Sequence, residues 1–193
     1  MEGKLIIFSG PSGSGKTSIV KYLLGKNLNL NFSISACSRE KRENEIHGKD
    51  YFFISANDFK EKIKNNDFLE WEEVYENHFY GTLLSEVEKI LKSGRNVIFD
   101  IDVIGGLNIK EKYNKQALSI FVKPPSIEEL KKRLINRSTE SADKLEKRIS
   151  KAEYEISFAK KFDELIINEN LNEAENVAFK IVNQFLFPNN QKN

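Results

Sequence analysis

The chain has 193 residues, of which 39% are hydrophobic and 31% are charged. This length suits one domain with inserted parts, and the composition is typical of a soluble globular protein rather than a disordered or membrane-embedded chain. Thirty basic and 29 acidic side chains leave a net charge of +1, which argues against nucleic acid or an anionic membrane as a partner. We therefore expect any anion site to be local.

Cysteine usage indicates the compartment. Cys37 is the only cysteine, so no intrachain disulfide can form, and with His47 and His78 as the only histidines we expect no zinc site. No apolar run approaches the length of a secretory signal or a membrane span. A reducing cytoplasm is the expected location.

The N-terminal elements are a strand, a glycine loop and a helix. Residues 4–8 form a short apolar run rich in strand formers, which breaks at the glycine-rich segment 9–15. From Lys16 onward, apolar residues recur at helical spacing as far as Gly25.

The middle of the chain has a different pattern, in which aromatic residues alternate with polar ones. In chain order, the pattern predicts short strands at 32–34 and 51–54, a helix at 57–64 that starts at an Asn or Asp cap, extended segments at 68–71 and 79–82, and a helix at 83–91. An inserted, largely β subdomain is the expected result.

The second half alternates strands with helices. The segment 96–102 has an apolar core without polar alternation and ends on two acids, which predicts a buried strand, and 118–122 repeats the pattern. Helical segments follow both, so we expect a parallel sheet with covered faces. Charged helix at 126–162, a strand at 165–167 and an amphipathic helix at 173–187 complete the chain.

Together these patterns predict a single α/β domain. It is a P-loop three-layer fold with a mostly parallel central sheet, an inserted mixed α+β subdomain and a helical lid. We assign the core to 1–32, 84–125 and 159–188, the inserted subdomain to about 33–83, the lid to about 126–158, and a frayed tail to 189–193.

The glycine loop matches a phosphate-binding motif. Residues 10–17 satisfy G-x-x-x-x-G-K-[ST] between a predicted strand and a predicted helix, whereas an ordinary glycine-rich turn seldom combines all eight positions. Inward-facing backbone N–H groups and the helix N-terminus bind phosphate oxygens, Lys16 reaches the β and γ phosphates, and Thr17 can hold Mg²⁺. The predicted ATP-binding set is Gly10, Pro11, Ser12, Gly13, Ser14, Gly15, Lys16, Thr17 and Ser18.

Asp100 and Asp102 close the predicted strand at 96–102. Ligands of open α/β folds bind at the carboxyl edge of the sheet, so both carboxylates are candidates for a place beside the metal. The alternative for either residue is a helix cap or a structural ion pair. Because many P-loop proteins end this strand with an acid, the pair indicates the fold and ATP but not the acceptor.

Order and spacing along the whole chain resemble the guanylate kinase family. The resemblance is carried by F-S-I-S at 32–35, G-K-D-Y at 48–51, F-L-E-W at 68–71, Y-G-T at 80–82 and P-P-S at 124–126. It implies an enzyme of purine nucleotide metabolism that transfers the γ-phosphoryl group of ATP to GMP. It also implies ATP and GMP as substrates, with Mg²⁺ as the cofactor.

The resemblance further implies a set of GMP-binding residues: Ser35, Arg39, Arg42, Tyr51, Glu70, Tyr80, Thr82 and Asp102. The arginines and tyrosines would bind the phosphate, whose oxygens suit guanidinium forks and phenol hydroxyls. Glu70 would accept hydrogen bonds from guanine N1 and the exocyclic amine, with Ser35 and Thr82 on the O6 side of the base. Adenine offers no matching donor pair, so it would be rejected.

The implied catalytic set is Lys16, Arg39, Arg137, Arg148 and Asp100. Arg137 and Arg148 would bring positive charge onto the transferring group from the lid, so no general base is required. Arg137 would also bind ATP, and Asn168 would contact the adenine ring. Thr17 and Asp100 would hold Mg²⁺, the aspartate through water.

Plainer interpretations of single residues stay open. Either arginine of the polar loop can be simply solvated, Glu70 can be a surface acid beside Trp71, and Asn168 can be only a turn residue. The role of Arg133 is undecided.

Two other functions also stay open. The first is a non-catalytic guanylate-kinase-like module that binds protein, although such modules typically lose the phosphate-binding residues kept here. The second is a P-loop kinase or GTPase with another substrate, which Glu70, Ser35 and Thr82 argue against. The sequence does not indicate the oligomeric state.

Overall fold

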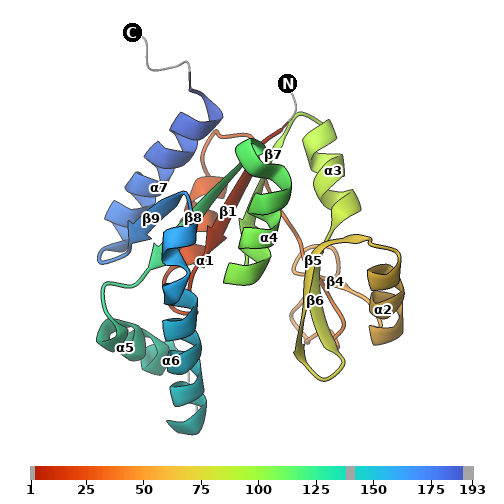
Figure 1. The fold of residues 1–193 in the computed structure, drawn as a ribbon, viewed down its shortest axis with the longest axis horizontal. Coiled ribbons are helices and arrows are strands. Elements are labelled where there is room, and N and C mark those ends of the chain that lie inside the picture. The colour runs from red at the N-terminus through yellow and green to blue at the C-terminus, as the bar shows by residue number, and fades with distance from the viewer. Residues whose placement is uncertain (1–2, 138–141, 189–193) are drawn as a thin grey trace. The chain divides into compact units, whose positions relative to one another are not determined.

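A computed structural model describes residues 3–137 and 142–188 of the chain (Figure 1). The chain forms two compact units, the first comprising Met1–Gly3 and Asn31–Val97 and the second Lys4–Leu30 and Ile98–Asn193. This division groups residues 84–97 with the middle of the chain, whereas the sequence assigns them to the core. The predicted tail at 189–193 and the lid residues 138–141 lie outside the described residues.

The larger sheet has five strands in the order β2-β7-β1-β8-β9; β1, β8 and β9 belong to the second unit, whereas β2 and β7 each cross a boundary of that unit. Strands β1, β8 and β9 pair in parallel, with Leu5 opposite Ala117 and Ile120 opposite Glu164. The elements are β1 (Leu5–Ser9), α1 (Lys16–Leu24), β2 (Leu30–Phe32), β7 (Asn96–Asp100), α4 (Val103–Tyr113), β8 (Ala117–Lys123), α5 (Ile127–Arg137), α6 (Ala142–Ser157), β9 (Glu164–Ile167) and α7 (Leu171–Leu186). The predicted α/β class with a mostly parallel central sheet is confirmed.

Helices cover both faces of this sheet because successive strand residues point to opposite sides. On one face, Ile6 and Phe8 of β1 pack with buried residues of α1 and α7, among them Leu23 and Val182. On the other face, α4 approaches β1 so closely that a Cβ at Gly106 would overlap Ser9. Fully burying each large aliphatic or aromatic side chain contributes about 1.5–3 kcal/mol, so this core fixes the sheet on which the glycine loop is built.

The first unit contains a smaller mixed sheet with the order β4-β3-β6-β5. Its elements are β3 (Ala36–Cys37), β4 (Phe52–Phe53), α2 (Ala56–Lys64), β5 (Phe68–Tyr75), β6 (His78–Leu83) and α3 (Leu84–Lys92). Phe59 of α2 stacks on Phe68 and Phe79, with ring centroids 4.2 and 5.3 Å apart. One face of the β5–β6 hairpin is therefore apolar, which leaves the alternate residues Tyr80 and Thr82 on the other face.

Two helix starts differ from the sequence prediction. Helix α2 begins after Ser55, whose hydroxyl accepts a hydrogen bond from the Asp58 N–H at 3.0 Å, and not at an Asn or Asp cap. Helix α7 begins at Leu171, capped by Asn170, two residues before the predicted start. Apolar periodicity locates the packed face of a helix, whereas a polar cap decides its first turn.

No helix in the described ranges combines the length and the low charge needed to cross a bilayer.

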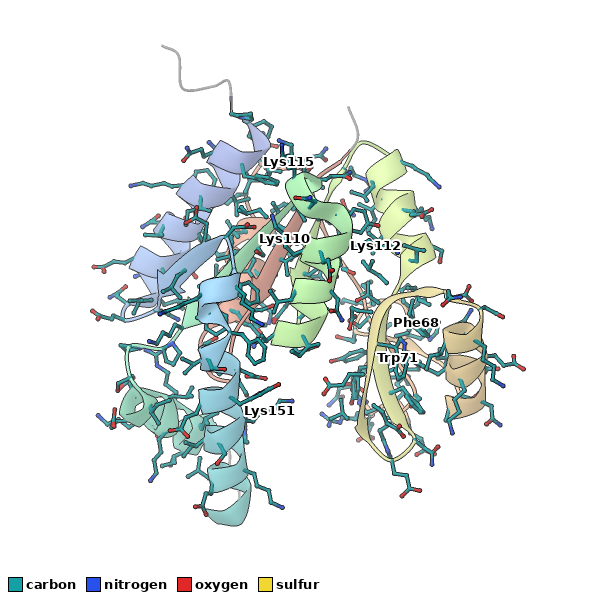
Figure 2. The ribbon with its side chains drawn as sticks, viewed as in Figure 1. Phe68, Trp71, Lys110, Lys112, Lys115 and Lys151 are labelled. Atoms are coloured by element: carbon teal, nitrogen blue, oxygen red, sulfur yellow. The ribbon has the colours of Figure 1, made fainter. Side chains whose placement is uncertain are left out.

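Lys110 of α4 (Figure 2) and Asp163 form an ion pair beside β8, with Nζ and Oδ2 2.8 Å apart. The same Oδ2 atom accepts hydrogen bonds from the N–H and the hydroxyl of Ser119, both at 2.8 Å. Burial raises the pKa of Asp163, but the hydrogen bonds from Lys110 and Ser119 together outweigh burial and lower it below 3.8. The carboxylate thus ties α4 and β8 to the start of β9.

Replacing Asp163 with Asn should lower the free energy of unfolding by about 1 kcal/mol at pH 7, because the amide accepts hydrogen bonds but lacks the charge. The lowered pKa means that the carboxylate stabilises the fold above about pH 4 and that this stabilisation is lost as the pH falls through the folded pKa. Urea unfolding at several pH values measures the difference, with Glu164→Gln on the exposed side of β9 as the control. A difference that stays constant down to pH 3 would contradict the role of the charge.

Candidate active site

The glycine loop lies between β1 and α1, as the motif predicts. Gly13 and Gly15 have φ values of 88° and 98°, which residues other than glycine rarely adopt. A Cβ at Gly13 would also press on Leu130 and Leu134 of α5. Both glycines are therefore required by backbone conformation and by close packing.

Asn168 braces this loop from the end of β9. Its Nδ2 donates a hydrogen bond of 2.7 Å to the carbonyl oxygen of Ser14, and the residue is only 3% exposed. A Cβ at Gly15 would overlap the same amide group. Asn168 thus does more than end a strand, because it fixes the backbone that surrounds the predicted phosphate position.

Ser14 carries an unusual hydroxyl group. Its Oγ is buried and has no hydrogen-bond partner among the described residues. Buried polar atoms are nearly always paired, so an orphaned hydroxyl in a glycine loop fits an anionic ligand that completes its hydrogen bonding.

Lys16, Thr17 and Asp100 converge at the carboxyl edge of the sheet. The Thr17 hydroxyl donates to Oδ2 of Asp100 at 2.5 Å, and Nζ of Lys16 lies 4.0 Å from Oδ1 of the same carboxylate. A hydroxyl beside a carboxylate is a set of hard oxygen donors, which fits Mg²⁺. The sequence-predicted metal residues are thus adjacent.

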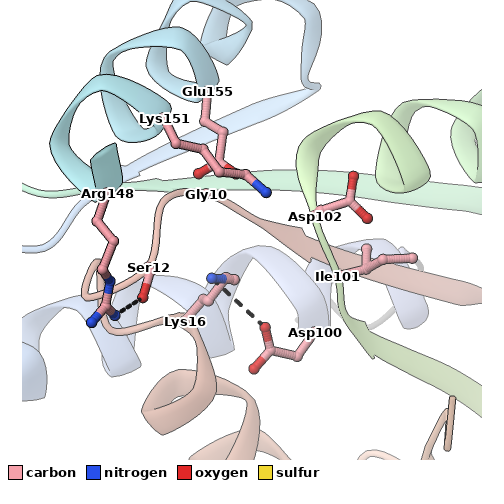
Figure 3. A pocket seen from close by; sticks show the side chains of 9 residues that line it. All are labelled: Gly10, Ser12, Lys16, Asp100, Ile101, Asp102, Arg148, Lys151 and Glu155. Atoms are coloured by element: carbon pink, nitrogen blue, oxygen red, sulfur yellow. Dashed lines mark hydrogen bonds and ion pairs between the residues drawn. The ribbon is translucent and has the colours of Figure 1, made fainter. Parts of the chain in front are cut away.

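A cavity of about 380 Å³ opens beside these residues (Figure 3). It is lined by Gly10, Ser12, Lys16, Asp100, Ile101, Asp102, Arg148, Lys151 and Glu155. Arg148 of α6 donates to the Ser12 hydroxyl at 2.6 Å, so the predicted catalytic arginine reaches the glycine loop. Lys151 and Glu155 were not predicted, although their spacing from Arg148 places them on the same helix face.

Asp102 lies at the same edge but serves as the N-cap of α4. Its Oδ1 accepts hydrogen bonds from the N–H groups of Ile104 and Gly105, both at 2.9 Å. The cap alternative for this acid is therefore correct, and its predicted contact with the nucleotide stays a prediction.

Two further arginines, Arg133 and Arg137, belong to α5. Arg137 ends α5, and its side chain lies outside the described residues. Arg133 pairs with Glu129 at 3.1 Å and donates to the Asn168 carbonyl oxygen at 3.0 Å. A second cavity of about 490 Å³ there is lined by Gly13, Gly15, Ser18, Arg133, Asn136, Asn168, Glu169, Asn170 and Leu171.

In the first unit, Arg39, Tyr51 and Tyr80 form a cluster. Nε of Arg39 donates to the Tyr80 hydroxyl at 3.2 Å, and the guanidinium lies 5.1 Å from the centroid of the Tyr51 ring. The tyrosine rings meet edge to face, with centroids 6.0 Å apart. Burial raises the pKa of Tyr51, so its hydroxyl stays a donor. Arg39 is thus not a solvated side chain, whereas Arg42 is exposed.

Glu45 completes this cluster and was not predicted. Its carboxylate binds Arg39 through two hydrogen bonds of 2.6 and 2.5 Å, and Oε2 also accepts from the Arg42 N–H at 2.9 Å. The hydrogen bond from Arg39, followed by that from the Arg42 backbone, lowers the pKa of Glu45 to about 2. The only sequence signal is an acid in a polar loop, which is too common to identify a partner.

Glu70 and Thr82 face each other across β5 and β6. The Thr82 hydroxyl donates to Oε1 of Glu70 at 2.6 Å, and the two residues are 1% and 9% exposed, respectively. The alternative of a surface acid is therefore wrong, although the neighbouring Trp71 is 47% exposed. Ala36 pairs with Gly81, and continuing that register by one residue brings Ser35 opposite Thr82.

Known proteins resemble this chain in amino-acid sequence over nearly its whole length. The model of the guanylate kinase family matches residues 2–185. A guanylate kinase of Bacteroides fragilis is 57% identical over 185 residues, which cover 96% of this chain and 91% of that protein. A guanylate kinase of Porphyromonas gingivalis is 48% identical over 184 residues, covering 95% and 98% of the two chains.

A solved structure agrees with these relatives. The crystal structure of guanylate kinase from Anaplasma phagocytophilum superimposes with a TM-score of 0.72 at 28% identity, covering 94% of this chain and 85% of that one. Family match, relatives and fold point the same way: the chain belongs to the guanylate kinase family.

Proposed function

We propose that this chain transfers the γ-phosphoryl group of ATP to GMP, forming ADP and GDP. The observation that carries the acceptor assignment is the buried Glu70–Thr82 pair, which lies in the same unit as the Arg39–Tyr51–Tyr80 cluster. The pair supplies a carboxylate for the N–H donors of guanine. The cluster supplies a cation and phenol hydroxyls for a phosphate.

Each GMP-binding residue has a role that its chemistry supports. Glu70 accepts from guanine N1 and the exocyclic amine, Thr82 and Ser35 serve the O6 side, and Asp102 lies near the nucleotide. Arg39, Arg42, Tyr51 and Tyr80 bind the phosphate. Adenine would not offer Glu70 the two N–H donors that guanine offers, which can cost about 10⁴-fold in discrimination.

ATP binds at the glycine loop in the second unit. The backbone N–H groups and the Ser14 hydroxyl hold phosphate oxygens, and Lys16 attracts the β and γ phosphates. Arg148 and Arg137 add positive charge as the transferring group leaves ADP. Asn168 contacts the adenine ring. Mg²⁺, held by Thr17 and through water by Asp100, neutralises phosphate charge when it is bound.

The reaction needs orientation more than proton transfer. An oxygen of the GMP phosphate attacks the γ-phosphorus of ATP while the bond to the β-phosphate oxygen breaks, so no general base is required. Lys16, Arg39, Arg137 and Arg148 stabilise the charge that spreads over the transferring group. Exclusion of water protects ATP from hydrolysis.

We also assign functions to the parts of the chain. The inserted subdomain, at about 33–83, binds GMP, and the lid, at about 126–158, closes over ATP. The cytoplasm is the proposed location. A non-catalytic protein-binding module is disfavoured, because Lys16 and Thr17 are retained beside Asp100 and the similar curated proteins are named as guanylate kinases.

An ADP-release assay with ATP and Mg²⁺ tests the proposal, with GMP, AMP, CMP and UMP as separate acceptors. We expect rapid turnover with GMP alone. Turnover with another nucleotide would keep the kinase and refute the base assignment, whereas no turnover with any of the four would favour the binding module.

Glu70→Gln should raise the KM for GMP by about 10- to 100-fold and leave the KM for ATP unchanged, because the amide cannot accept two N–H donors as the carboxylate does. Steady-state kinetics with each substrate varied measures the effect. Glu76→Gln, in the exposed turn of the same hairpin, is the matched control. Equal effects of the two variants would contradict a role in reading the base.

Asp100→Asn should raise the Mg²⁺ concentration needed for half-maximal activity by about tenfold, because a neutral amide is a weaker ligand in either coordination shell. A Mg²⁺ titration at saturating ATP and GMP measures it. The KM for GMP should change little. An unaltered Mg²⁺ dependence would remove Asp100 from the metal site.

A further inference from the structure

The loop between β3 and β4 contains an ion pair whose function is not explained by the ligand assignments. Arg39 and Glu45 are joined by two hydrogen bonds, and their side chains are only 13% and 18% exposed. Pairs of this kind are stronger than exposed ones, since two parallel hydrogen bonds fix the guanidinium plane. The pair therefore sets the orientation of Arg39.

The hydrogen bonds of Arg39 occupy particular edges of its guanidinium. Nη1 donates to Oε2 of Glu45 and, at 3.0 Å, to the carbonyl oxygen of Glu40, while Nη2 donates to Oε1. Nε donates to the Tyr80 hydroxyl. With five N–H groups in a planar fork, these contacts leave one Nη2 hydrogen, on the edge that also carries Nε.

Glu45 also controls the backbone of the second predicted phosphate ligand. Its Oε2 accepts from the Arg42 N–H at 2.9 Å, so one carboxylate holds the side chain of Arg39 and the main chain of Arg42. Its lowered pKa keeps it charged throughout the neutral range. A single acid thus organises both arginines of the loop.

We propose that Glu45 is the positioning residue of the GMP phosphate site. Its carboxylate occupies the Nη1–Nη2 end of Arg39, which presents the remaining Nη2 hydrogen and the adjacent Tyr80 hydroxyl to the phosphate as one surface. This inference rests on the proposed function, since it assumes that Arg39 and Tyr80 bind the phosphate of GMP.

In a competing arrangement, the Glu45 carboxylate is a stand-in: it occupies the place of the GMP phosphate on Arg39 and is displaced when GMP binds. Displacement would break both hydrogen bonds to Arg39 and the one from Arg42. It would also bring the phosphate to the end of the guanidinium, away from the edge that faces Tyr80. The two arrangements predict opposite effects of removing the charge of Glu45, because a positioning residue aids GMP and a stand-in competes with it.

The test compares GMP with guanosine, which lacks the phosphate, as ligands of the full chain with and without Glu45→Gln. We expect the Kd for GMP to rise by about 10- to 100-fold, because a charge-assisted pair is lost, and the Kd for guanosine to stay unchanged. The KM for ATP should also be unaffected. Glu43→Gln, an exposed acid in the same loop, is the matched control and should bind GMP as the parent does.

Other outcomes overturn the proposal. Tighter GMP binding by Glu45→Gln would identify a stand-in, unchanged binding would remove any role, and equal losses for GMP and guanosine would indicate only a structural effect. If Glu45→Gln is unfolded by thermal melting, Glu45→Asp decides, since a shorter acid should weaken GMP and spare guanosine.

A double variant checks that the effect passes through Arg39. In an Arg39→Lys background, which lacks the fork, Glu45→Gln should cause a smaller loss of GMP affinity than in the parent, because only the hydrogen bond from the Arg42 N–H is left to weaken. A full additional loss would overturn the positioning role. Failure of the parent chain to bind GMP would refute the proposed function itself. Normal binding by the parent with no effect of Glu45→Gln would refute only this inference.

Discussion

The hydrogen bond from Asn168 to the carbonyl oxygen of Ser14 joins the last strand of the central sheet to the glycine loop. It forms because β1, β8 and β9 run in parallel, so the carboxyl ends of β1 and β9 open at the same edge. The amide fills the space beside Gly15 that a side chain would otherwise occupy. The shape of the loop therefore depends on the whole sheet, not on its eight residues alone.

This dependence explains what the sequence could predict. The glycine loop, the buried strands and the alternation of strands with helices are local patterns, so they were predicted with nearly correct bounds. The contact between Ser14 and Asn168 spans 154 positions, and no local pattern reports it. The resemblance to a family suggests a ligand contact for Asn168, which stays a prediction, and the observed partner of its amide Nδ2 is the carbonyl oxygen of Ser14.

Charged residues were harder to interpret than apolar ones for a related reason. An acid in a polar loop or on a charged helix looks the same in sequence whether it is solvated or buried. Glu45 and Glu155 were missed on that account, and both are largely shielded from solvent in the fold. Glu70 was identified only because neighbouring residues resemble a known family. The sequence also allowed Glu70 to be a surface acid, and its burial in the structure excludes that alternative.

The polar face of the β5–β6 hairpin is fixed by its apolar face. Phe79 points toward Phe59 of α2, so the residues on either side of it in β6 must point the other way. A slip of one residue would turn Tyr80 and Thr82 into the aromatic core and expose Phe79. Since stacked aromatic pairs resist such a slip, the phenylalanines of α2 and the hairpin hold Glu70 opposite Thr82. The proposed recognition of the base thus depends on residues outside the proposed ligand set.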